Sequence, residues 1–315
     1  MGIKKCAYCG KETKGTKEHI ISSGVLDLFP ECFLTTDEAK GIVHEADPVI
    51  KDVCAECNNN RISYIDSYAK NIIAKNFLKK YEEDENIKFE YDYVLMQKVL
   101  LKYAYNDLRV HKENIDFYDE DILSYLMSEK EDKPKRNIIL LGGLAVNTSP
   151  VPDYIFGNQK LMWLGNPILF ANSIVMNLNY GTGEIVLREP FEIEKFEDLI
   201  FSYVFRFNSG QFILLCFDKD ISEERLEQLK VVLSVQYPYA VLNEEGESEL
   251  SRCTSETTYH HIGLIDVSWG QGIFDEISIM RGLAAPESRE YFKKMTTEWE
   301  KYEKQLAKEH KRKEL

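Results

Sequence analysis

The sequence predicts an α+β protein in which a small N-terminal module precedes a helical extension and a larger, mostly antiparallel α+β domain. Two Cys-x-x-Cys pairs lie within the first 57 of its 315 residues. Apolar residues then recur at helical spacing up to residue 128, and beyond residue 137 the pattern changes to period two with β-branched and aromatic runs. These three observations place the module at residues 1–80, the helical extension at 81–130 and the α+β domain at 137–315.

The cysteine pairs, Cys6 with Cys9 and Cys54 with Cys57, predict a metal site in the module. Four thiolates at this spacing are typical of a tetrahedral zinc site, and the sequence shows no secretory signal that would favour disulfides. We therefore expect these four cysteines to bind one structural Zn²⁺. A zinc knuckle that only binds a partner is the alternative explanation of the same residues.

Between and beside the cysteine pairs lie residues that a purely structural zinc site does not need: Glu18, His19 and Asn58. Neutral His19 can take a proton from an attacking water, because an imidazole titrates near neutral pH. The Glu18 carboxylate and the Asn58 amide oxygen suit a hard cation such as Mg²⁺ or Mn²⁺. We therefore predict a metal-assisted catalytic site, in which the zinc fixes the distance between the strand that carries His19 and the helix that Asn58 opens.

The order Cys-x-x-Cys, Glu-His-Ile-Ile and Cys-x-x-Cys-Asn-Asn resembles the HNH endonucleases, specifically their zinc-stapled ββα-metal variety. The resemblance covers about the first quarter of the chain. It implies that His19 is the general base and that Glu18 and Asn58 hold the catalytic divalent ion, with Asn59 as an alternative to Asn58. It also implies a nucleic-acid substrate, for which we expect DNA.

Two positions depart from the pattern of that family. The acidic position, often Asp there, is Glu18 here. No Asn between His19 and Cys57 matches the middle Asn that usually orients the base. Asp47 or Asp52 could take the place of that Asn.

Each candidate residue also has a purely structural explanation. His19 could be a packed core histidine, and Asn58 could simply cap a helix. We assign Arg61 and Lys17 to substrate contact. Arg61 lies one helical turn beyond Asn58, and Lys17 is the last of five lysines in residues 4–17, the first arm of the motif. An exposed helix arginine is the structural alternative for Arg61. His44 is a weaker additional candidate.

The first half of the chain divides into a knuckle with a strand pair at residues 6–20, an insertion at 22–53, and helices. Three helices are expected: from Asn58 onward, over residues 93–110 and over residues 119–128. The charged, proline-containing stretch 129–136 follows them. We interpret it as the boundary between the helical extension and the α+β domain.

Beyond the boundary, the period-two pattern predicts strands over residues 138–146, 161–164, 173–178, 184–187, 201–207 and 212–217. Helices are expected over residues 223–236 and 287–311. The sequence of this second domain shows no P-loop, no complete dinucleotide fingerprint and no Ser-His-Asp elbow. The adjacent His260 and His261 would point to opposite faces of a strand, so a shared ion is not expected there.

The net charge of −14 opposes nucleic-acid binding by the chain as a whole, because phosphate contacts need Lys and Arg. The first 80 residues, however, contain eleven Lys and one Arg against eleven acidic residues, a net charge of +1 that leaves −15 on the remainder. We expect the module to face nucleic acid and the acidic C-terminal domain to repel it. That domain would then gate the target, or contact a protein partner or a second copy in a homodimer.

No apolar run approaches the roughly 20 residues of a membrane span, so no membrane contact is expected. The remaining cysteines, Cys32, Cys216 and Cys253, are scattered as free thiols, which suits a reducing, cytoplasmic location. The leading hypothesis is a metal-dependent HNH endonuclease with structural Zn²⁺ and catalytic Mg²⁺ or Mn²⁺. The alternative is a catalytically silent zinc-knuckle module that binds nucleic acid or protein.

Overall fold

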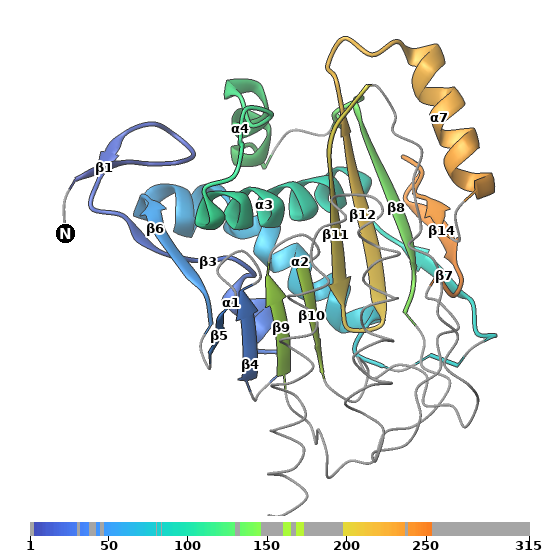
Figure 1. The fold of residues 1–315 in the computed structure, drawn as a ribbon, viewed down its shortest axis with the longest axis horizontal. Coiled ribbons are helices and arrows are strands. Elements are labelled where there is room, and N and C mark those ends of the chain that lie inside the picture. Colours follow the sequence, from blue (N-terminus) through green and yellow to red (C-terminus); the bar gives the residue numbers. More distant parts are fainter. Residues whose placement is uncertain are drawn as a thin grey trace, which may run out of the picture.

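The computed structural model confirms the α+β class (Figure 1). It describes residues 3–29, 32–37, 42–44, 47–79, 81–82, 84–129, 133–145, 160–164, 168–172, 198–236 and 239–253. The strands predicted over residues 173–178 and 184–187, the helix predicted over 287–311 and the His260-His261 pair lie outside these ranges.

The N-terminal module contains an antiparallel strand pair followed by a helix, which is the ββα arrangement that the sequence predicts. Strand β3 pairs with β6, with His19 opposite Val49 and Glu18 opposite Ile50. A short antiparallel pair, β1 with β2, precedes them and carries the first cysteine knuckle. The elements of the module are β1 (Lys4–Lys5), β2 (Glu12–Thr13), β3 (Thr16–His19), α1 (Ser23–Leu26), β6 (Val49–Val53), the π-helical turn η1 (Cys57–Arg61) and α2 (Ser63–Asn76).

Two helices follow at the predicted places, α3 (Tyr93–His111) and α4 (Glu120–Met127). Each begins at an Asp whose carboxylate accepts a hydrogen bond from the backbone N–H three residues on, Asp92 from Leu95 and Asp119 from Ile122. Helix α3 is buried almost all round, including its polar residues between positions 97 and 107. A helix buried on every side belongs to the centre of the molecule.

The main sheet has eight strands in the order β13-β8-β12-β11-β10-β9-β4-β5. Neighbours are antiparallel except β10 with β11 and β4 with β9, so the prediction of a mostly antiparallel sheet is confirmed. The strands are β4 (Cys32–Asp37), β5 (Ile42–His44), β8 (Ile138–Leu144), β9 (Lys160–Leu164), β10 (Ile168–Asn172), β11 (Leu199–Phe207), β12 (Gly210–Phe217) and β13 (Ala240–Val241). Helix α7 (Glu223–Gln236) and the pair β7 (Ile87–Glu90) with β14 (Glu247–Leu250) complete the described elements.

The insertion between the cysteine pairs belongs to this sheet, because β4 and β5 form its edge beside β9. Helix α3 also joins the two parts, running from β6 of the module to β12 of the sheet (Figure 1). The end of α2 is held there as well, since Asn208 Nδ2 donates to the carbonyl oxygen of Phe77 at 2.7 Å and the Phe77 ring packs on Phe212. The module therefore packs on the sheet through several elements.

None of the described helices combines the length and the apolar character that a bilayer span requires.

Candidate functional site

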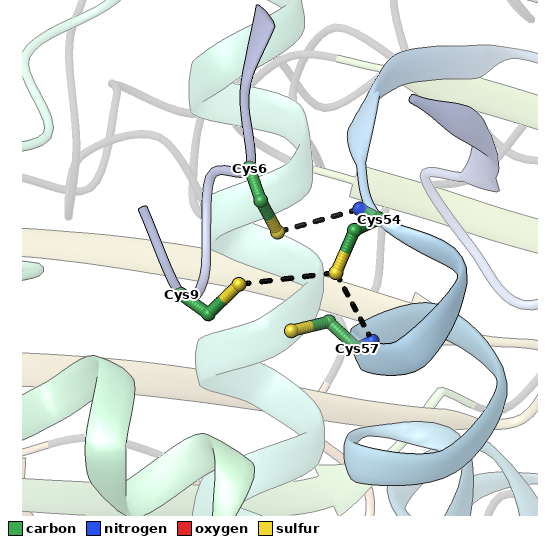
Figure 2. A group of neighbouring side chains, drawn as sticks. All are labelled: Cys6, Cys9, Cys54 and Cys57. Carbon is green, nitrogen blue, oxygen red and sulfur yellow. Dashed lines mark hydrogen bonds between the residues drawn. The ribbon is translucent and has the colours of Figure 1, made fainter. Parts of the chain in front are cut away.

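The four cysteines of the two predicted pairs come together at one end of the module (Figure 2). Their sulfur atoms all lie within 4.8 Å of one another, and the Sγ atoms of Cys9 and Cys54 are 3.8 Å apart. A tetrahedral zinc site with Zn–S bonds of about 2.3 Å has sulfur atoms about 3.8 Å from each other. The cluster could therefore hold a structural metal ion such as zinc.

The local backbone explains how each cysteine reaches the cluster. In the first knuckle, the N–H of Gly10 donates to the carbonyl oxygen of Cys6 at 2.9 Å, and Gly10 has a φ of +70°, which suits a residue without a Cβ. In the second knuckle, the N–H of Asn58 donates to the carbonyl oxygen of Cys54 at 2.9 Å. Each chain segment turns tightly enough to direct both of its thiols to one point.

Backbone N–H groups also point at the sulfur atoms. The N–H of Cys54 donates to the Cys6 sulfur at 3.3 Å, and the N–H of Cys57 donates to the Cys54 sulfur at 3.4 Å (Figure 2). Burial raises the pKa of the Cys6 thiol, but the N–H groups of Cys54, Cys9 and Tyr8 outweigh it and bring that pKa down to about 7. Such N–H groups stabilise thiolates, the form that binds metal.

Glu18 is buried, with 2% of the residue exposed, and forms an ion pair. Its Oε1 lies 2.8 Å from the Nζ of Lys102, a fully buried residue of α3. The same ammonium lies 2.5 Å from Oδ1 of Asp66 on α2. Asn106 of α3 adds a hydrogen bond to Glu18 Oε1 at 3.3 Å. The carboxylate of Glu18 is therefore enclosed between the strand and α3.

His19 lies beside Glu18 on β3 but points to the other side of the strand, where it is partly exposed. Its imidazole forms no hydrogen bond within the part of the chain that the structure describes. Asn106 Nδ2 holds the backbone here, donating to the carbonyl oxygens of His19 at 3.1 Å and Ile20 at 3.3 Å. The backbone of His19 is fixed while its imidazole stays accessible.

Asn58 holds the start of β3. Its Nδ2 donates to Thr16 Oγ1 at 2.9 Å and to the carbonyl oxygen of Lys17 at 3.1 Å. The sequence predicted that Asn58 begins a helix. In the structure it lies inside η1, the π-helical turn that precedes α2. Lys17, Asn59 and Arg61 are exposed on the surface around it. Of the predicted site residues, Asn58 and Lys17 are thus in contact, whereas Glu18 contacts residues of the interior.

The two aspartates proposed in place of the middle Asn differ in position. Asp47 is exposed, whereas Asp52 Oδ1 accepts a hydrogen bond from Arg109 Nη1 at 2.6 Å. Arg109 in turn donates to Asn106 Oδ1 at 2.6 Å. The side chain that binds the backbone of His19 is therefore Asn106, which lies outside the module's own sequence. The side chain of His44 lies outside the described part.

Asp66, Lys102, Asn106 and Arg109 were not among the predicted site residues. A signal for the last three was present, because charged and amide residues recur within an otherwise apolar helix. A lysine or an amide in the middle of a buried helix is costly unless it has a partner. Its partner on β3 or α2 could not be identified without the tertiary structure.

Comparison with protein-family models, with curated proteins and with solved structures gives no match to this chain. The geometry of the site is therefore the basis for assigning a function.

Proposed function

We propose that residues 1–80 form a zinc-stapled nuclease module of the HNH type, which hydrolyses phosphodiester bonds in nucleic acid, with DNA as the expected substrate. The observation that supports this most directly is the position of His19. It lies on a strand that the cysteine cluster and Asn106 hold in place, and its imidazole is partly exposed without a hydrogen bond to a described residue. A fixed backbone with an accessible imidazole is what a general base needs.

In this proposal, neutral His19 takes a proton from the water that attacks the phosphorus atom. Lys17 and Arg61 are exposed on the two segments that flank the site, so their charges can meet the phosphate oxygens. Asn58 ties these segments together through its bonds to Thr16 and Lys17. A zinc ion on the four cysteines would hold the β1–β2 knuckle against the start of η1 and would take no part in the chemistry.

The first arm of the module offers a surface for the phosphate backbone. Lys4, Lys5, Lys11 and Lys14 are all exposed on or beside β1 and β2, and this pair projects from the body of the molecule (Figure 1). Exposed lysines on a projecting arm can reach a nucleic acid while the acidic remainder of the chain stays apart from it.

The resemblance also implies a catalytic Mg²⁺ or Mn²⁺ on Glu18 and Asn58. The two residues differ in how well they fit such an ion. The Oδ1 of Asn58 accepts no hydrogen bond from a described residue, whereas Glu18 Oε1 is bound by Lys102 and Asn106. Glu18 therefore has the role of an anchor that holds β3 against α3.

The ion pair of Glu18 also favours a second candidate function. A module whose acidic site residue is bound to a buried lysine could be a catalytically silent zinc module that binds nucleic acid or protein. The exposed lysines of the arm would then provide affinity without cleavage.

Cleavage of supercoiled plasmid by the purified, zinc-loaded chain, with and without Mg²⁺ or Mn²⁺, tests the proposal. We expect nicking that falls at least about a hundredfold in His19→Ala, because a general base contributes about 10²- to 10⁴-fold. Asn60→Ala is the control, since Asn60 is exposed on η1 and its side chain bonds only Glu56 among the described residues. Both variants should keep the zinc content and melting temperature of the wild type.

The outcomes separate the two candidates. Nicking that persists in His19→Ala removes the base from the proposal. A different result would favour the silent binding module. In that case neither DNA nor RNA is cut, but the chain binds nucleic acid, and the logarithm of its binding constant falls linearly with the logarithm of the salt concentration.

A further inference from the structure

The charged group at the centre of the buried part of the site is Lys102. It is 0% exposed, and its ammonium lies 2.8 Å from Glu18 Oε1 and 2.5 Å from Asp66 Oδ1. These three side chains come from α3, β3 and α2, three separate elements of the fold. Two carboxylate oxygens converging on one cation is the arrangement that a divalent ion would also require.

The surroundings keep this ammonium charged and in place. Burial alone lowers the pKa of Lys102, but the carboxylates of Asp66 and Glu18 raise it more, so the net direction is upward. Withdrawing the lysine would leave the buried carboxylate of Glu18 with the amide of Asn106 as its one side-chain partner among the described residues, and a buried carboxylate without its counterion is strongly unfavourable. Lys102 is therefore a fixed part of the site.

A divalent ion on Glu18 would compete with this ammonium for the same oxygen. Mg²⁺ binds oxygen at about 2.1 Å and Mn²⁺ is bound by the same oxygen ligands. Such an ion on Oε1 would stand close to a positive charge in a buried site, where water screens the repulsion poorly. Glu18 Oε1 and Asp66 Oδ1 already face one cation, the ammonium that Lys102 brings from α3.

We propose that the ammonium of Lys102 is the resident cation of the Glu18 and Asp66 pair, in the place of a divalent ion, and that the native protein binds no Mg²⁺ or Mn²⁺ through Glu18. The inference rests on the proposed function only because that function leads us to expect a catalytic divalent ion at Glu18. Any catalytic divalent ion must then bind without the Glu18 carboxylate. Helix α3 thus supplies part of the module's site by neutralising its acidic residue.

The test is Mn²⁺ binding to the zinc-loaded full chain, followed by electron paramagnetic resonance of the free ion and by calorimetry. Lys102→Met removes the ammonium and keeps a long side chain, so we expect it to bind one more Mn²⁺ per chain than the wild type. Lys98→Met is the matched control, because Lys98 is also a fully buried lysine on α3, but its Nζ donates to the carbonyl oxygen of Ser128 at 2.7 Å. We expect no added ion in Lys98→Met.

A second comparison, between the wild type and Glu18→Gln, does not depend on how well Lys102→Met folds. Wild type and Glu18→Gln should bind Mn²⁺ with equal stoichiometry and affinity. Loss of a bound ion in Glu18→Gln would overturn the proposal, and so would a folded Lys102→Met that gains no ion. Both readouts are binding measurements, so an absence of nuclease activity would count against the proposed function alone.

Discussion

At the scale of single residues, the cysteine cluster gives the most direct prediction. Cys57→Ser should lower the bound zinc well below one ion per chain and lower the melting temperature, because a hydroxyl replaces one of four thiolates. Cys216→Ser is the control, since Cys216 is also buried but lies in β12, outside the cluster. Zinc content by elemental analysis and thermal unfolding measure the two effects.

Chelation should reproduce the effect of Cys57→Ser in the wild type. Removing the metal leaves four thiols packed within 4.8 Å of one another, and the knuckles lose the bond that joins them. Equal zinc content in Cys57→Ser and Cys216→Ser would show that the metal is bound elsewhere.

The residues of the site differ in how far the sequence could predict them. Cys6, Cys9, Cys54 and Cys57 follow from spacing alone, because a metal requires nearby ligands whatever the rest of the fold. The partner of Glu18 could not be predicted in this way. Lys102 reaches it only because α3 packs across β3, and that packing depends on the whole apolar surface of the helix.

At the scale of elements, helix α3 ends in a way that can be tested. Lys112, its C-terminal cap, has a φ of +59° and is exposed. A left-handed conformation is unfavourable for a residue with a Cβ and readily adopted by glycine. Lys112→Gly should therefore raise the free energy of unfolding by about 0.5 to 1 kcal/mol.

Lys112→Ala is the matched control, because it removes the lysine side chain but keeps the Cβ. Urea unfolding of the two variants and the wild type gives the comparison. A Lys112→Gly variant no more stable than Lys112→Ala would show that the cap conformation costs little.

The helices were more predictable than the sheet for a physical reason. Residues 93–110 and 119–128 carry their own apolar spacing and their own capping aspartate, so local sequence defines them. Strands β4 and β5 were not predicted as part of the main sheet. Their place depends on pairing with β9, more than a hundred residues away, and strand pairing over that distance leaves no local pattern.

At the scale of the whole molecule, the division into a module at residues 1–80 and a domain at 137–315 stays a prediction, and the sheet crosses it. Strands from the insertion at 22–53 pair with β9, and α3 contacts both β6 and β12. The end of α2 reaches the β11–β12 turn, where Ser209 Oγ donates to the Phe77 carbonyl oxygen at 3.1 Å. These contacts predict that the zinc module and the sheet unfold together.

Gly210→Ala tests this coupling at one contact. A Cβ on Gly210 would lie 2.7 Å from the ring of Phe77, and that ring cannot move away easily because it packs against both Phe89 and Phe212. Overpacking of this kind costs about 1 to 3 kcal/mol. Gly24→Ala is the control, since the added Cβ would meet only Lys70 at an ordinary 3.4 Å.

Two probes report on the two parts of the molecule during urea unfolding. Zinc release reports on the module, and tryptophan fluorescence reports on the rest, because all three tryptophans lie beyond residue 160. We expect the two midpoints to coincide in the wild type and to shift together in Gly210→Ala, because a contact shared by both parts stabilises one cooperative unit. If only the fluorescence midpoint shifted, the zinc module would be an independent folding unit, and α3 could not hold His19 in place from the sheet side.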